Sequence, residues 1–232
     1  MKYKNFISAV SEARLSKYKY ATKGKKKQLI QLYHHNIKLS QRMFGVIGMF
    51  EIILRNAIYR HYTKQYNNSE WIITEARYGK LLEHEANSIN KTKTKFIRLG
   101  TYSADKMVAT FSFGFWTYLF SRRNYRLGGK TLLQIFPYRK KGVKAIEIYN
   151  ELNSIREFRN RVAHHEPICF DKEKNINSTY AWKIYKLICT YLEYMGYDAT
   201  KALKIVEKPD SVLRALEKMN TNMNKNSGEV SN

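Results

Sequence analysis

Cysteine, proline and acidic side chains are all scarce in this chain of 232 residues. Two cysteines, Cys169 and Cys189, are too few for a disulfide framework or a cysteine-based zinc site. With three prolines and eleven glycines, no Pro/Gly/Ser-rich linker divides the chain, so the sequence predicts one domain over residues 1–220 and a flexible polar tail over 221–232. Nothing near the N-terminus resembles a signal peptide, and we expect a cytoplasmic protein.

A long hydrophobic run is also missing. The most apolar stretch, residues 43–54, contains Glu51 and lies between Arg42 and Arg55. It is far shorter than the roughly 20 apolar residues that a membrane-spanning helix needs. The sequence therefore predicts a buried helix here and no membrane partner.

Acidic residues are outnumbered by basic ones, 19 against 42, which gives a formal net charge of +23. Such a charge attracts polyanions, and nucleic acid is the partner class that it favours. The 18 tyrosines fit this interpretation because exposed rings can stack on unpaired bases. The alternative is an ordinary solvated surface in a protein from an AT-rich genome, since Lys, Asn, Ile and Tyr are all abundant.

Apolar residues recur at helical spacing rather than in alternation, so we predict an all-α fold. A break near Ser40 in the longest helix is left open, and Ser103 is expected to cap a short helix. Helices are expected over residues 4–20, 26–66, 75–98, 129–136, 142–164, 178–195, 198–206 and 210–219.

Three of these segments carry patterns that bear on packing. The helix at 26–66 should bury a broad apolar face made of Phe44, Ile47, Phe50, Ile53, Leu54 and Ile58. Residues 111–120 are dense in aromatics, which indicates a packing cluster rather than a platform for stacked bases. The lysine-rich segment 91–98 is either an exposed, solvated helix end or a docking patch.

The most informative stretch is 159–168, with the sequence Arg-Asn-Arg-Val-Ala-His-His-Glu-Pro-Ile. Imidazoles can supply the base and the acid for attack of a ribose 2′-hydroxyl on a phosphodiester, and a guanidinium can stabilise the phosphorane. The candidate catalytic residues are therefore Arg159, Asn160, His164 and His165. Arg161 and Glu166 are expected to support them, and we expect neither a metal nor another cofactor.

Helix geometry separates these groups. Arg156, Asn160 and His164 recur every four residues along one stripe, whereas Arg159 lies about 140° from His164 on an ideal helix. The Arg159 side chain must curl round, the last turn must distort, or a second molecule must complete the site. A homodimer is the simplest source of two imidazoles, so we predict a composite site.

Spacing alone cannot decide the role of the motif. An Arg followed by a His after four to six residues also occurs at Arg55–His61 and at Arg77–His84. Catalysis, phosphate binding without catalysis and a structural helix cap all remain open. A metal site formed by His164, His165 and Glu166 with His34 and His35 is disfavoured, because adjacent helical residues point about 100° apart. Nucleophilic chemistry at Cys169 is also disfavoured, and this residue is expected in the core.

Basic residues outside the motif are expected to contact the phosphates of RNA. Most of them precede the motif on the same predicted helix or in the segments before it. They are Arg122, Arg123, Arg139, Lys140, Lys141, Lys144 and Arg156.

Residues 159–168 resemble the signature of Abi-like abortive-infection proteins, a branch of the HEPN superfamily with an Arg-Asn-x-x-x-His motif. Residues 13–18, 50–56 and 113–120 are similar to other segments of that family. The likeness covers about residues 10–170, and its C-terminal signature is the specific part.

The resemblance implies a single HEPN-like helical bundle that is commonly dimeric and acts on RNA, often as a metal-independent endoribonuclease in phage defence or toxin–antitoxin systems. It matches Arg159 and His164 to the catalytic pair, Asn160 to the amide between them, and Glu51 and Arg55 to supporting polar positions. Some relatives work with a structured noncoding RNA, so the alternative is a non-catalytic RNA-binding protein that forms such a complex.

Overall fold

The computed structural model describes the backbone of residues 3–228 and the side chains of residues 3–223. Within that part all regular structure is helical, with twelve α-helices, two short 3-10 helices and no strand. A single isolated bridge pairs Phe170 with Ile176. The predicted all-α class is confirmed.

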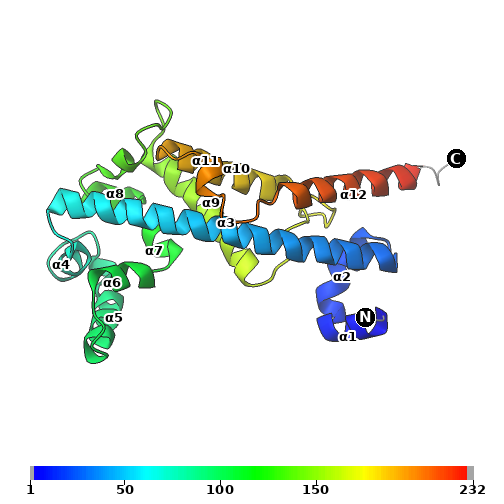
Figure 1. Ribbon diagram of the computed structural model, residues 1–232, viewed down its shortest axis with the longest axis horizontal. Coiled ribbons are helices and arrows are strands. Elements are labelled where there is room, and N and C mark those ends of the chain that lie inside the picture. Colours follow the sequence, from blue (N-terminus) through cyan, green and yellow to red (C-terminus); the bar gives the residue numbers. More distant parts are fainter. Residues whose placement is uncertain (1–2, 229–232) are drawn as a thin grey trace. The chain divides into compact units, whose positions relative to one another are not determined.

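The chain divides into two compact units, which we describe separately. The first unit contains residues 1–47, 158–187 and 203–232, and the second contains residues 48–157 and 188–202. Helix α3 (Lys26–Tyr66) passes through both units as one uninterrupted helix (Figure 1), without the break considered near Ser40. Helices α9 (Ala145–Ala163) and α10 (Thr179–Tyr194) are also shared.

The first unit begins with two helices where the sequence predicted one. Helix α1 (Tyr3–Val10) and α2 (Glu12–Ala21) are separated by Ser11, whose φ of 77° interrupts the helix. The Ser11 hydroxyl accepts a hydrogen bond from the backbone N–H of Arg14 at 3.3 Å, which caps α2. The core of this unit is formed mainly by Leu15, Tyr18, Leu29, Leu32, Leu39, Met43, Phe158, Ile168, Ile184, Leu213 and Leu216.

The unit ends with α12 (Asp210–Gly228), which follows a loop after Leu203. Val212, Leu213, Leu216 and Met219 are buried at helical spacing. The helix continues through much of the expected flexible tail at 221–232, and residues 229–232 lie outside the described residues.

The second unit consists mostly of short helices. They are α4 (Trp71–Arg77), η1 (Glu83–Glu85), α5 (Ala86–Arg98), α6 (Ala104–Thr110), α7 (Phe113–Tyr118), α8 (Arg122–Leu127), η2 (Leu132–Ile135) and α11 (Ala199–Ala202). Ser103 caps α6 by accepting a hydrogen bond from the Lys106 backbone N–H, as predicted. Phe111, Phe113, Trp116 and Phe120 are buried, so the aromatic segment is a packing cluster.

Two predicted helices of this unit were wrong. The one at 75–98 is interrupted after Arg77, where the Glu75 carboxylate folds over Gly79 and accepts a hydrogen bond from the Leu81 N–H at 3.4 Å. A Cβ at Gly79 would collide with that carboxylate. The one at 129–136 is only the 3-10 turn η2, and the preceding α8 ends at Leu127 with Gly128 as its C-cap.

Candidate functional site at the end of helix α9

Helix α9 ends at Ala163 in a Schellman turn within the motif, one residue before the predicted end. The His165 N–H donates to the Val162 carbonyl at 3.0 Å, and the Glu166 N–H donates to the Arg161 carbonyl at 2.9 Å. His165 occupies the left-handed position with a φ of 56°, where glycine is usual. A side chain is therefore held at a backbone position that costs about 1–2 kcal/mol for an L-residue.

The distorted turn brings His165 and Arg159 to one cavity. This cavity, the motif pocket, has a volume of about 590 Å³. It is lined by Ile37, Ser40, Gln41, Phe44, Arg159, Val162, Ala163 and His165. The pocket thus combines a half-buried guanidinium and an exposed imidazole with apolar walls.

Phe44 is the clearest departure from the predicted core of α3. Its side chain is 53 % exposed, whereas Met43, Val46, Ile47, Phe50 and Leu54 are buried. The buried residues follow a spacing of three and four, and Phe44 lies about 100° away from that stripe. Phe44 is a wall of the motif pocket instead.

His164 lies immediately beyond the last residue of α9. Its N–H still donates to the Asn160 carbonyl at 2.9 Å, so it continues the stripe of Asn160, and both side chains are exposed. His164 is not among the described residues that line the motif pocket. Of the two histidines, the structure places His165 with Arg159.

Arg161 and Glu166 contact each other across the turn. The Arg161 Nε lies 3.4 Å from the Glu166 Oε2, and its Nη2 donates to the Pro167 carbonyl at 2.7 Å. Because Glu166 is more than half exposed, the ion pair itself adds little stability. The Arg161 contacts hold the chain that follows the turn.

Two further anchors were not predicted from the sequence. Arg14 of α2 donates through Nη1 to the His165 carbonyl at 3.2 Å. The buried Asn36 of α3 accepts a hydrogen bond from the Ile168 N–H at 2.9 Å through its Oδ1. Both contacts fix the backbone around the left-handed residue, and Arg14 belongs to the N-terminal segment that resembled the family.

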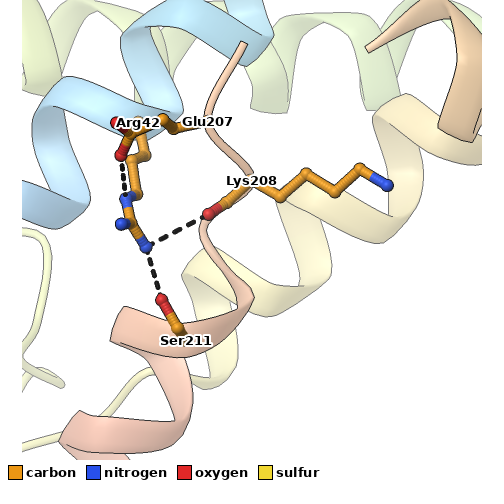
Figure 2. Close-up of polar contacts among 4 residues, drawn as sticks. All are labelled: Arg42, Glu207, Lys208 and Ser211. Carbon is orange, nitrogen blue, oxygen red and sulfur yellow. Dashed lines mark hydrogen bonds and ion pairs between the residues drawn. The ribbon is translucent and has the colours of Figure 1, made fainter. Parts of the chain in front are cut away.

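Arg42 of α3 binds the C-terminal segment 207–211 near the motif pocket. Figure 2 shows its guanidinium reaching Glu207, the Lys208 carbonyl and the Ser211 hydroxyl. The distances are 3.0 Å from Nε to Glu207, 3.3 Å from Nη1 to Lys208 and 2.5 Å from Nη1 to Ser211. The neighbouring Gln41 lines the motif pocket, so Arg42 links that part of α3 to the start of α12.

The alternatives based on Cys169 and on a metal receive no structural support. Cys169 is fully buried, as predicted, and burial raises the pKa of its thiol, which opposes nucleophilic reactivity. Among the described residues, no group of three or more His, Cys, Asp or Glu side chains is arranged to hold a metal ion.

The basic residues expected to bind RNA fall into two groups within the second unit. Arg122, Lys140, Lys141 and Lys144 are exposed. The other three, Arg123, Arg139 and Arg156, contact other residues of this unit.

Arg139 donates to the carbonyls of Leu133 and Phe136, both at 3.1 Å, and Arg123 pairs with Glu83 at 3.2 Å. Arg156 lies over Gly114 of α7, where a Cβ would be 3.5 Å from its Cδ and Nη1. The hydrogen bonds of Arg139 and the ion pair of Arg123 leave fewer of their donors for RNA, whereas Arg156 only packs close to Gly114.

Glu51 and Arg55 are both half-buried on α3, in the second unit. The Nε atoms of Arg55 and of Arg156 are buried and have no hydrogen-bond partner within the described residues. A supporting role for Glu51 and Arg55 in catalysis stays a prediction.

None of the described helices combines the length and the apolarity that crossing a membrane requires. No curated protein and no solved structure matches the chain. A family model described as an Abi-like protein matches residues 2–169, and this family is associated in general with abortive infection, a form of phage defence. Because the match covers more than half of the sequence and includes the whole motif, the chain belongs to the Abi-like protein family.

Proposed function

We propose that this protein is a HEPN-type, RNA-binding component of phage defence or of a toxin–antitoxin system that cleaves RNA without a metal. The observation that supports this most directly is the motif pocket, in which Arg159 and His165 meet beside the exposed His164. A cation and an imidazole in one open cavity are what a bound phosphodiester requires.

In the proposed reaction, one imidazole removes the proton from a ribose 2′-hydroxyl, whose oxygen then attacks the adjacent phosphorus. The bond from phosphorus to the 5′-oxygen breaks, and an imidazolium gives that oxygen a proton. Arg159 stabilises the charge of the phosphorane through paired N–H donors. The products are a 2′,3′-cyclic phosphate and a free 5′-hydroxyl.

The supporting arguments point to two different histidines. The family resemblance matches His164 to the catalytic position, whereas the geometry places His165 in the pocket of Arg159. The strained backbone at His165 is a second argument, because strain of this kind is retained where the side chain has a use. We assign proton transfer to this pair of histidines together, with Asn160 as an orienting amide.

A homodimer is part of the proposal. A two-fold axis close to the motif would supply four imidazoles and two Arg159 side chains to one composite site. The experiment is to mix Arg159→Ala protein with His164→Ala protein, each inactive alone. Recovered cleavage in the mixture, together with a dimer mass in light scattering, is expected. A monomer with full activity would contradict the composite site.

The decisive test of catalysis is cleavage of a mixed RNA pool in the presence of EDTA. We expect 2′,3′-cyclic phosphate ends with the wild-type protein and at least a hundredfold slower cleavage with His164→Ala and with His165→Ala. His84→Ala is the matched control, since His84 is exposed and follows Arg77 at similar spacing. Unchanged cleavage in both motif variants would refute the assignment.

The alternative is a non-catalytic protein that binds a structured noncoding RNA. The net charge of +23 and the exposed Arg122, Lys140, Lys141 and Lys144 favour it. Binding should then weaken steeply with salt, while His164→Ala leaves affinity unchanged. Co-purified RNA of one defined size would support this function, and decay of many cellular RNAs on expression would support the nuclease.

A further inference from the structure

A second cavity lies in the second unit, beside the C-terminal part of α3. This cavity, the cationic pocket, has a volume of about 340 Å³. It is lined by Ala57, Arg60, His61, Lys64, Gln134, Ile135, Pro137, Met195 and Tyr197. No acidic side chain is among these described lining residues, and none of them lines the motif pocket.

Two basic side chains of α3 line this pocket. Arg60 and Lys64 are four residues apart on α3, so their side chains leave the helix on the same face, one turn apart. Both are exposed, and neither forms an ion pair within the part of the chain that the structure describes. Like charges at this spacing repel each other. An anion bound between the two side chains would attract both and offset that repulsion.

Other elements give the pocket an apolar and aromatic lining. Tyr197, which is 40 % exposed, lines it together with Ile135, Pro137 and Met195. An exposed ring with apolar neighbours can stack on a nucleobase, and such stacking is tolerant of base identity.

A backbone hydrogen bond holds the segment that precedes Tyr197. The Tyr138 N–H donates to the Tyr194 carbonyl at 3.1 Å, which joins the loop after η2 to the end of α10. Gly196 adopts a φ of 85°, and a Cβ there would lie only 2.9 Å from the Tyr138 ring. The chain can therefore pass close to Tyr138 and present Tyr197 because residue 196 is glycine.

His61 adds a polar group without adding charge. Burial lowers its pKa, which favours the neutral imidazole at neutral pH. The Thr131 hydroxyl donates to the oxygens of Gln65 and Gly128, and this fits the tautomer in which the His61 Nε2 donates to Thr131 at 2.9 Å. In that tautomer the His61 Nδ1 is an acceptor, which suits a ribose hydroxyl or an exocyclic amino group.

We propose that the cationic pocket binds a nucleoside monophosphate unit, with its phosphate on Arg60 and Lys64 and its base against Tyr197. Cations, one aromatic ring and a neutral acceptor around a cavity of this size match the parts of such a ligand. The unit can be a free nucleotide or the 5′-phosphorylated end of an RNA strand. This site is additional to RNA cleavage at the motif, and it does not require that cleavage.

The experiment is isothermal titration calorimetry of the full chain with AMP and UMP, followed by adenosine and inorganic phosphate as partial ligands. We expect both nucleotides to bind and each partial ligand to bind at least tenfold more weakly. Arg60→Ala and Lys64→Ala should each weaken AMP binding at least fivefold, and Tyr197→Ala about tenfold. Arg126→Ala, Lys106→Ala and Tyr78→Ala are the matched controls, because all three residues are exposed in the same unit.

A second arm distinguishes the two sources of the ligand. A tetraadenylate carrying a 5′-phosphate is compared with the same strand carrying a 5′-hydroxyl, in protein made inactive by Arg159→Ala. Tight binding of the phosphorylated strand alone, lost in Arg60→Ala, assigns the pocket to RNA ends, and stronger binding of AMP assigns it to free nucleotides. Absence of binding by every phosphorylated probe, or equal binding in all three pocket variants, would overturn the proposal whatever the cleavage assay shows.

Discussion

The pair Arg159 and His165 and the pair Arg55 and His61 have the same spacing in the sequence, yet the structure uses them differently. Arg55 and His61 lie within the C-terminal part of α3, where six residues of regular helix correspond to about 240° of rotation. His61 lines the cationic pocket with Arg60 and Lys64 instead of Arg55. At the end of α9, the left-handed turn at His165 places it in one pocket with Arg159. The same spacing brings an arginine and a histidine into one pocket only where the helix ends.

The largest expected effect comes from Arg159. Arg159→Lys keeps the charge but loses the planar pair of donors, so we expect RNA cleavage to fall by about a hundredfold or more. The same change at Arg55, its counterpart in the comparison, should alter cleavage less than tenfold. The measurement is single-turnover cleavage of a labelled RNA, with folding checked by circular dichroism.

Equal losses in the two lysine variants would show that the comparison is wrong. Arg126→Lys serves as a surface control because Arg126 is exposed on α8.

The left-handed turn gives a sharper test, because stability and activity should respond in opposite directions. His165→Gly removes the cost of a side chain at positive φ, so the free energy of unfolding should stay equal or rise by about 1 kcal/mol. Cleavage should fall at least a hundredfold, since the imidazole leaves the motif pocket. Urea denaturation and the cleavage assay on the same preparation measure both.

His61→Gly is the matched change within a helix. It should destabilise the protein by about 1 kcal/mol through lower helix propensity together with loss of the Thr131 contact, and it should leave cleavage at the motif intact. A stable His165→Gly protein with normal cleavage would remove His165 from the mechanism.

The sequence could predict the fold class and the region of the site, because helical periodicity and the motif are both local signals. It placed Cys169 in the core, Ser103 at a helix start and the aromatics of residues 111–120 in a packing cluster. It could not predict which histidine joins Arg159, since that depends on one residue that adopts a positive φ without being glycine.

Several features of the structure were not predicted, for different physical reasons. The Ser11 hydroxyl caps the start of α2, and the Glu75 carboxylate beside Gly79 binds the Leu81 N–H, so at both places a polar side chain binds the backbone where the apolar pattern continues. Phe44 was predicted in the core because it is apolar, but it lies off the buried stripe. The spacing of Met43, Ile47 and Phe50 already contained the signal that defines this stripe. The contacts of Arg14 and Arg42 join residues more than 150 positions apart, which no local pattern reveals.

A smaller effect is expected at Arg42, which tests whether the motif pocket depends on the segment outside the family match. Arg42→Ala should lower the free energy of unfolding by about 1–2 kcal/mol, because the contacts with the Lys208 carbonyl and the Ser211 hydroxyl are lost. Glu207→Ala should cost less than about 0.5 kcal/mol, since the Glu207 side chain is 80 % exposed. Chemical denaturation of both variants is the measurement.

If the segment from 206 to 211 positions the wall of the motif pocket, Arg42→Ala will also slow cleavage by a few-fold, and Glu207→Ala will not. A stability loss without any change in cleavage would make the C-terminal segment a structural support alone.

The smallest effect concerns pH and involves one histidine in each unit. Burial lowers the pKa of His35 in the first unit, aided by Lys38 and His34, and burial also lowers the pKa of His61 in the second. Below the unfolded value of 6.5 the unfolded chain binds more protons at these positions than the folded chain does. Stability from the neutral imidazoles is therefore full above that pH and is lost as the pH falls through the lowered values.

His35→Gln and His61→Gln should each flatten the fall in unfolding free energy between about pH 7 and about pH 5, measured by urea denaturation. His84→Gln is the matched control, because His84 is exposed. A steeper slope in either variant would mean that the folded state prefers the charged imidazole, which is the opposite of what burial requires. If only His61→Gln flattens the slope, the acid sensitivity belongs to the second unit and not to the unit that contains the motif pocket.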